Sequence, residues 1–149
     1  MNVNDEKKQS MTFMKGVCGI AAVILAALLL LIGSFIYVTR YRITDIDTAT
    51  SEDGQYEVIY QAVGEPDWPF GYAHVRLVLK RGQEIITKYK FDVANDGGSP
   101  SAEQWSVGWK DDHVEVLVTG EEQPDRLYTL FYNGITEWKE LDTQSGEWR

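Results

Sequence analysis

An uncharged, apolar run over residues 16–39 constrains this chain more than any other feature of its sequence. At a helical rise of about 1.5 Å per residue, the run is longer than the roughly 30 Å hydrocarbon core of a bilayer. A helix that is apolar on every face needs lipid or a large protein around it, and the 149 residues of this chain suffice for one modest domain. The run therefore predicts a transmembrane helix over residues 16–39, preceded by a short tail over residues 1–15.

The residues that flank the run suit a membrane boundary and also bear on its orientation. Phe13, Tyr37 and Tyr41 are aromatic residues of the kind that favours the headgroup layer. Within about 20 residues of the run, three lysines precede it and two arginines follow it. Because Lys and Arg are favoured on the cytoplasmic side, this count predicts a single-pass protein with an extracytoplasmic C-terminal domain. The margin of one residue leaves the inverted topology open.

A cleaved signal peptide is the alternative interpretation, since it too has basic residues before an apolar run. Signal peptides have apolar runs of about 7 to 15 residues, and this one is longer. The small-residue candidate for a cleavage site, Gly33 and Ser34, is followed by the bulky Phe35. These features favour an uncleaved anchor. Cys18, the only cysteine, lies inside the run, so the region after it contains no disulfide.

Residues 43–149 form the water-soluble part of the chain and carry its acidity. They contain 9 Lys or Arg and 21 Asp or Glu, a formal charge of −12, whereas the whole chain carries −9. Binding to nucleic acid depends on clustered Lys and Arg, so this balance argues against a polynucleotide partner. With 44% hydrophobic residues, the chain has enough apolar surface to fold. We therefore expect one acidic domain over residues 43–149.

The sequence pattern of this domain predicts an all-β fold. Short runs of alternating apolar and polar residues recur between clusters of Gly, Pro, Asn and Asp, and no long helical period appears. The pattern predicts an antiparallel β-sandwich or small barrel of about eight strands. The expected strands cover residues 43–47, 56–62, 75–79, 85–91, 105–109, 114–118, 127–132 and 135–139. The strongest hairpin signal is Asn133-Gly134, where both turn residues tolerate a positive φ.

Alternation along each strand predicts which side chains face the core. Trp105, Trp109 and Trp138 lie on strands and are expected to pack in the core or across strands rather than to form a sugar-binding platform. The other side chains expected to point inward are Tyr56, Val58, Tyr60, Ala62, Val75, Leu77, Leu79, Ile85, Tyr89, Phe91, Val114, Val116 and Val118.

The connections between strands predict where a binding surface would lie. In simple up-and-down order, the tight turns share one end of the domain, and the long loops over residues 64–71, 92–101 and 120–125 share the other. The first strand leaves the membrane and the second returns, so the first long loop would face the bilayer. We expect the three loops to form one acidic, membrane-proximal surface.

Two kinds of candidate binding residue lie on these loops. Trp68 and Phe70 lie beside prolines and are candidates to anchor a partner or to rest at a membrane interface. The alternative for Trp68 is that it folds back and plugs one end of the sandwich. The acidic and amide candidates are Glu65, Asp67, Asp92, Asn95, Asp96, Glu121, Glu122 and Asp125.

Oxygen atoms of these acidic residues are the ligands that a hard cation such as calcium prefers. The loops do not reproduce the spaced Asp and Asn pattern of a known calcium loop, and turns use the same residues for backbone reasons. We therefore expect solvated loop residues, with no metal site and no cofactor, and keep a cation-dependent ligand sensor or envelope enzyme as the alternative.

No catalytic residue is predicted. The carboxylate pairs Asp45 with Asp47 and Asp111 with Asp112 lie on an edge-like strand and in a hairpin turn, and each has a structural role there. His74 points away from the apolar face of its strand, His113 lies at a turn, and the domain has no cysteine to complete a zinc site. Whether the protein is an enzyme stays open, and the sequence favours a non-enzymatic one.

Several segments of the domain resemble a family of small membrane-anchored proteins of Gram-positive bacteria, a domain of unknown function. The resemblance covers about residues 43–133, and its most distinctive piece is VGEPDWPFG over residues 63–71. The other segments lie at residues 53–56, 95–97, 105–109 and 120–125. The resemblance implies a bacterial cell envelope and assigns no activity or site residue. The expected function is a non-enzymatic binding or accessory module at the cell membrane, with the bilayer around residues 16–39 and a membrane or envelope protein as partner.

Overall fold

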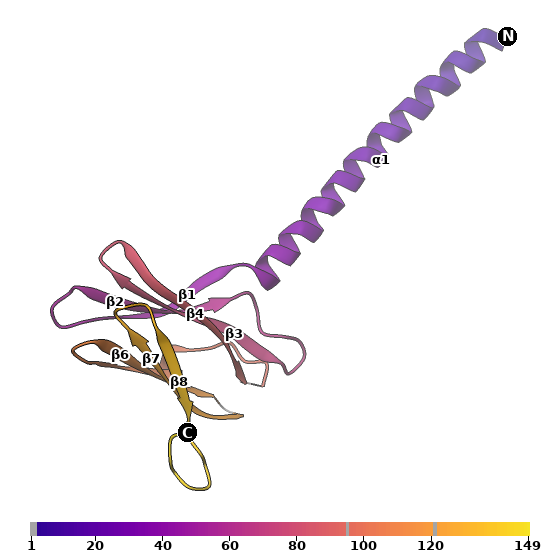
Figure 1. Ribbon diagram of the computed structural model, residues 1–149. Helices are drawn as coiled ribbons and strands as arrows, with labels where there is room; N and C mark the ends of the chain where they lie inside the picture. The colour runs from indigo at the N-terminus through magenta and orange to yellow at the C-terminus, as the bar shows by residue number, and fades with distance from the viewer. Residues whose placement is uncertain (1–2, 95, 121) are drawn as a thin grey trace. The chain divides into compact units, whose positions relative to one another are not determined.

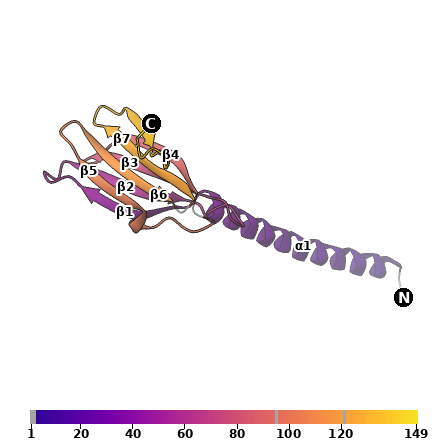
Figure 2. The same cartoon turned by 90° about the horizontal axis from the view of Figure 1, so that it is seen from below.

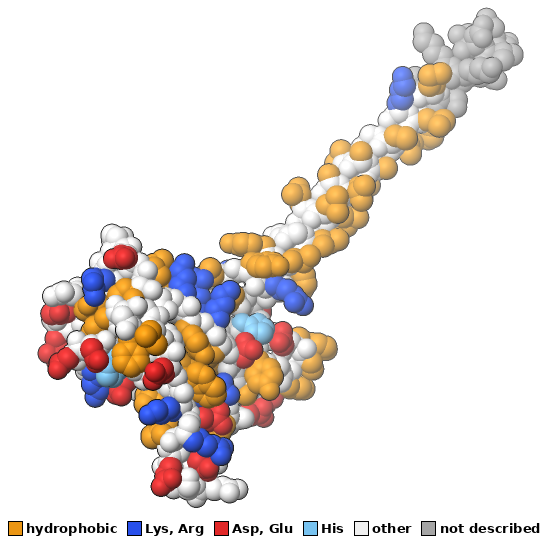
Figure 3. Space-filling model, viewed as in Figure 1, with side chains coloured by type: hydrophobic (Ala, Val, Ile, Leu, Met, Phe, Trp, Pro, Cys, Tyr) orange, Lys and Arg blue, Asp and Glu red, His pale blue; other side chains and the backbone are white. Residues whose placement is uncertain are grey.

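The computed structural model describes residues 3–94, 96–120 and 122–149. The chain divides into two compact units, Met1–Tyr37 and Val38–Arg149. The first unit consists of helix α1 (Val3–Arg40), whose last residues belong to the second unit (Figure 1). The most apolar stretch of its segment Phe13–Arg40 has a mean hydropathy of 2.8, and none of that stretch is buried. Hydrophobic side chains cover the face of this helix seen in Figure 3. The helix is long and apolar enough to span a membrane, in agreement with the expected span at 16–39.

The second unit is an all-β sandwich, which confirms the predicted fold class. Two separate four-stranded antiparallel sheets form its layers (Figure 1), so the barrel alternative is wrong. The first sheet, in the order β1-β2-β3-β4, contains β1 (Ile43–Thr50), β2 (Tyr56–Val63), β3 (Tyr72–Arg81) and β4 (Glu84–Ala94). The second, in the order β5-β6-β7-β8, contains β5 (Trp105–Trp109), β6 (His113–Gly120), β7 (Gln123–Phe131) and β8 (Thr136–Glu140), with a short 3-10 helix η1 (Ala102–Gln104) before it.

The hydrophobic core lies between the two sheets. Trp105 and Trp109 pack against it as expected, and the Trp105 indole nitrogen also donates to Oδ2 of Asp47 on β1 at 2.9 Å. The Phe91 and Tyr128 rings stack across the sheets with centroids 4.2 Å apart. The buried residues of the core are Val58, Tyr60, Val75, Leu77, Leu79, Val93, Val114, Val116, Val118, Tyr128 and Leu130. Eight of them were predicted to point inward, and these predictions are confirmed.

A bulge on β4 overturns one predicted face. Leu79 pairs with Thr87, whereas Lys80 pairs with Ile85, so Ile86 is an extra residue in the ladder. The extra residue shifts the alternation, with the result that Ile86 packs against the core and Ile85 is 46% exposed. The inward orientation expected for Ile85 is therefore wrong, because the prediction assumed an unbroken ladder.

The hairpin between β7 and β8 is confirmed, but its turn differs from the expected one. The amide of Phe131 donates to the carbonyl of Ile135, and the amide of Gly134 donates to the carbonyl of Phe131, each at 2.9 Å. These bonds enclose a three-residue loop in which Gly134 has φ +92° and Asn133 does not have a positive φ. The glycine alone supplies the left-handed conformation, as in three-residue hairpin loops.

Each sheet is an up-and-down meander, so its connections alternate between two ends of the sandwich (Figure 2). One end, the turn end, has the connections at residues 51–55, 82–83, 110–112 and 132–135. The other, the loop end, has those at 64–71, 95–104 and 121–122. The third long loop is shorter than expected, because β7 begins at Gln123 and already includes Asp125.

Candidate functional site

The connection between β2 and β3, residues 64–71, holds four of the predicted candidates, and we call it the aromatic loop. Its backbone is fixed at both of its ends. The hydrogen bonds run from the amide of Gly64 to the carbonyl of Arg42 (2.7 Å), Glu65 to Thr39 (2.9 Å), Asp67 to Tyr72 (3.0 Å), and Gly71 to Asp67 (2.8 Å). The last bond closes one tight turn, and Trp68, Pro69 and Phe70 lie within it.

The two aromatic residues of this turn point into solvent. Trp68 is 92% exposed and Phe70 is 74% exposed. The alternative that Trp68 plugs the end of the sandwich is therefore wrong. The interior is already filled by rings of the strands, including the Phe91–Tyr128 stack. Large apolar side chains left in water on a fixed backbone are typical of a contact surface.

A histidine between two carboxylates holds the side of the aromatic loop to the first sheet. His74 Nδ1 lies 2.7 Å from Oδ1 of Asp92, its partner on β4, and His74 Nε2 lies 3.4 Å from Oδ2 of Asp67 in the loop. The hydrogen bond to Asp92, together with the charges of both carboxylates, raises the pKa of His74 above its ordinary value, against the opposing effect of burial. Protonated His74 can donate to both carboxylates at once, which links β3, β4 and the loop.

The structure brings the loops of the loop end together. The amide of Gly97 donates to the carbonyl of Gly71 at 3.2 Å, and the amide of Glu122 donates to the carbonyl of Ala94 at 3.3 Å. The predicted candidates Glu65, Asp67, Asp96 and Glu122 are exposed at this end, whereas Asp125 is half-buried in β7; Asn95 and Glu121 lie outside the described residues.

These acidic side chains do not assemble into a ligand set. Within residues 3–94, 96–120 and 122–149, no group of three or more His, Cys, Asp or Glu side chains is placed to hold a metal ion. The described residues therefore offer no observation in favour of the cation-dependent alternative.

The two other carboxylate pairs have structural partners. Asp47 accepts hydrogen bonds from the Trp105 indole and from the amide of Thr48, which lower its pKa. Asp45 accepts from the Gln61 side chain, and Asp112 lies 2.5 Å from Nδ1 of His113. These contacts agree with the structural roles expected for both pairs.

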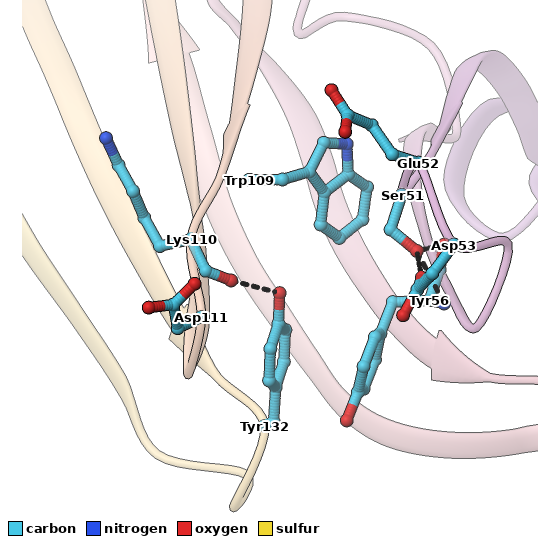
Figure 4. A pocket seen from close by; sticks show the side chains of 8 residues that line it. All are labelled: Ser51, Glu52, Asp53, Tyr56, Trp109, Lys110, Asp111 and Tyr132. Carbon is cyan, nitrogen blue, oxygen red and sulfur yellow. Dashed lines mark hydrogen bonds between the residues drawn. The ribbon is translucent and has the colours of Figure 1, made fainter.

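A pocket at the turn end was not predicted. It has a volume of about 430 Å³ and is lined by Ser51, Glu52, Asp53, Tyr56, Trp109, Lys110, Asp111 and Tyr132 (Figure 4). Its residues come from the turn between β1 and β2 in one sheet and from the β5–β6 and β7–β8 hairpins in the other. Strand alternation places Tyr56 and Trp109 inward, but the sequence does not say which turns of two different sheets face each other.

Comparison of the chain with protein-family models, with curated proteins and with solved structures found no match. The fold itself defines the class of protein: an N-terminal helix that is able to span a membrane, followed in the chain by an eight-stranded antiparallel β-sandwich. Its two surface features, the aromatic loop and the turn-end pocket, lie at opposite ends of the sandwich.

Proposed function

We propose that this chain is a single-pass protein of the bacterial cell membrane that holds its acidic β-sandwich on the extracytoplasmic side. There it acts as a non-enzymatic binding or accessory module and contacts a neighbouring membrane or envelope protein through the aromatic loop. The observation that carries the proposal is the exposure of Trp68 and Phe70 on a loop with a fixed backbone.

The fixed backbone favours binding because little conformational freedom remains to be lost. Exposed, rigidly held aromatic residues are the side chains most often found at the energetic centre of an interface. The four backbone hydrogen bonds of the loop and the contact of His74 with Asp67 order it before any partner arrives. Most of the hydrophobic free energy gained by burying Trp68 in a partner would then appear as binding free energy.

The attachment of the loop favours a partner in or near the membrane. Thr39 and Arg42 accept the hydrogen bonds of Glu65 and Gly64, and they lie one residue before and two residues after Arg40, where the segment able to span a bilayer ends. Trp68 follows Glu65 by three positions, so the two Cα atoms are at most about 11 Å apart. The excess of lysines before the span and the resemblance to membrane-anchored proteins of Gram-positive bacteria support the extracytoplasmic side and the cell envelope.

Site-specific photo-cross-linking tests the proposal in intact cells. A photoreactive aromatic amino acid replaces Trp68 in the full chain, and the same amino acid replaces Ile135, which is 54% exposed at the turn end, as the control. We expect a discrete protein adduct from position 68, absent from position 135. The yield of this adduct is expected to fall at least about tenfold when Phe70→Ala is added, because a central interface residue is then lost.

Two results would contradict the proposal. One is an equal adduct from positions 68 and 135, which would show that the aromatic loop has no privileged contact. The other is a loop that cross-links to lipid alone, which would make it a membrane-surface anchor. The matched control for Phe70→Ala is the double variant Ile85→Ala with Ile135→Ala. It removes comparable exposed apolar surface outside the aromatic loop and therefore reports general effects on folding.

A further inference from the structure

We infer that the turn-end pocket binds a small organic ammonium group. This site is separate from the aromatic loop, and it does not depend on the function proposed for that loop. The pocket joins three aromatic rings to three carboxylates, a combination that suits a cation with an apolar surface.

The two tyrosine rings of the pocket are fixed by their contacts, and one of them already lies against a cation. The rings of Tyr56 and Tyr132 stack with centroids 3.9 Å apart and planes inclined by 12°. The guanidinium of Arg81 lies 4.9 Å from the centre of the Tyr56 ring. The Tyr132 hydroxyl donates to the carbonyl of Lys110 at 2.9 Å, which fixes the second ring (Figure 4). The tyrosine pair is thus a rigid wall, and Trp109 is the ring that remains beside it for a ligand.

Trp109 is the best suited of the three rings to hold a cation, because indole attracts cations more strongly than phenol does. Figure 4 shows its ring between the tyrosine pair and the carboxylate of Glu52. Trp109 lies at the end of β5, and part of its side chain packs against the core. The ring is therefore held in place by the sandwich rather than by a mobile loop.

The charges around the rings favour a cation over a neutral or anionic ligand. Three carboxylates, those of Glu52, Asp53 and Asp111, line the pocket. The one basic residue of the lining is Lys110, whose amino group points away from the rings in Figure 4, and Arg81 lies against the Tyr56 ring without lining the pocket. Asp53 accepts hydrogen bonds from the Ser51 hydroxyl at 2.6 Å and from the amide of Gln55 at 3.0 Å. These bonds fix one carboxylate at the edge of the pocket, while Glu52 and Asp111 are exposed and able to adjust to a ligand.

The character of the pocket selects an organic cation rather than a metal ion. Hard metal cations need several oxygen ligands at short distance, whereas here rings supply much of the surface. A volume of about 430 Å³ is within the usual range for small-molecule sites and holds a methylated or primary ammonium with its first carbons. An ammonium of this kind occurs on a lysine side chain, on an amino sugar or on a choline-like headgroup.

The test is a titration of the full chain in detergent micelles, followed by the NMR signal of the Trp109 indole N–H. The probes are choline, n-butylammonium and glucosamine, which stand for the three sources, and 3,3-dimethylbutanol, which has the shape of choline without its charge. We expect saturable shifts with at least one ammonium, which binds about fivefold more tightly than the neutral alcohol. The order of affinities among the three ammonium probes identifies the source.

Variants separate binding in the pocket from general attraction to an acidic domain. Glu52→Gln with Asp111→Asn is expected to weaken ammonium binding about fivefold. The matched control, Glu65→Gln with Glu122→Gln, removes the same charge at the loop end and is expected to leave it unchanged. The inference is overturned if no ammonium shifts the Trp109 signal, if the alcohol binds as tightly, or if both double variants weaken binding equally.

Discussion

The backbone amide of Glu65 donates a hydrogen bond to the carbonyl oxygen of Thr39, with 2.9 Å between nitrogen and oxygen. Thr39 lies in the last turn of α1, and Glu65 is the second residue of the aromatic loop. The surface that we propose for binding is therefore attached directly to the residues at which the apolar helix ends.

This attachment depends on a glycine. Gly64 has φ +74°, and a Cβ atom there would lie 2.4 Å from the Thr39 carbonyl oxygen. Gly54 has a similar φ of +69° but open space around it. Gly54→Ala should lower the free energy of unfolding by about 1–2 kcal/mol through the left-handed backbone alone. Gly64→Ala should lower it by more, because the backbone of the loop must move as well. Denaturation of the full chain in micelles measures both, and equal losses would contradict the close approach.

The pKa of His74 predicts a pH-dependent loop. Its raised pKa means that the folded state favours the protonated ring more than the unfolded state does. The resulting stabilisation is complete below the ordinary value of 6.5 and is lost as the pH rises through the higher pKa of the folded protein. After correction for intrinsic exchange rates, hydrogen exchange at the Gly71 amide should therefore be slower at pH 6 than at pH 8.

NMR titration of two variants shows which carboxylate raises the pKa of His74 more. Asp92→Asn should lower the pKa of His74 more than Asp67→Asn does, because the hydrogen bond to Asp92 is the largest cause of the raised pKa. Both changes should reduce the pH dependence of exchange at Gly71. A His74 pKa at its ordinary value in the unmodified protein, or one insensitive to both variants, would contradict the contacts of His74 with Asp67 and Asp92.

A buried hydroxyl predicts a stabilising substitution. Tyr60 is fully buried, its hydroxyl has no hydrogen-bond partner among the described residues, and burial raises its pKa strongly. Tyr60→Phe should therefore raise the free energy of unfolding by about 1 kcal/mol, since an unsatisfied polar atom leaves the core. Tyr128 is the matched control: burial raises its pKa to about 12, but the neighbouring Arg126 side chain acts in the opposite direction and stabilises the polar hydroxyl. Tyr128→Phe should lower the free energy of unfolding by about 1 kcal/mol. Thermal unfolding would contradict this if Tyr60→Phe were the more damaging change.

Much of this fold was predictable because strand alternation and turn residues are local signals. The inward positions of Val114, Val116 and Val118 follow from a strict period of two. The bulge at Ile86 was not predictable, because it depends on how two strands pair and not on either strand alone. The same limit applies to the turn after Phe131, where the hydrogen bonds decide between a two-residue and a three-residue loop.

The candidate site shows the same division. Trp68 and Phe70 were found because two aromatic residues among prolines are unusual in a loop, but only the structure shows them exposed. The contacts of His74 were not predictable, because its two partners, Asp67 and Asp92, are 25 residues apart in the chain. The turn-end pocket needs turns of different sheets to meet, which no local pattern encodes.

Every part of the proposed function depends on the side of the membrane that the β domain occupies. Replacement of Cys18 by Ala leaves the chain without thiols, so that single cysteines at Gln83 and Thr143, both exposed in the β domain, report its location. In intact bacterial cells, a membrane-impermeant thiol reagent should label both positions in protein that stays in the membrane fraction. Labelling only after lysis would place the domain in the cytoplasm and contradict the account.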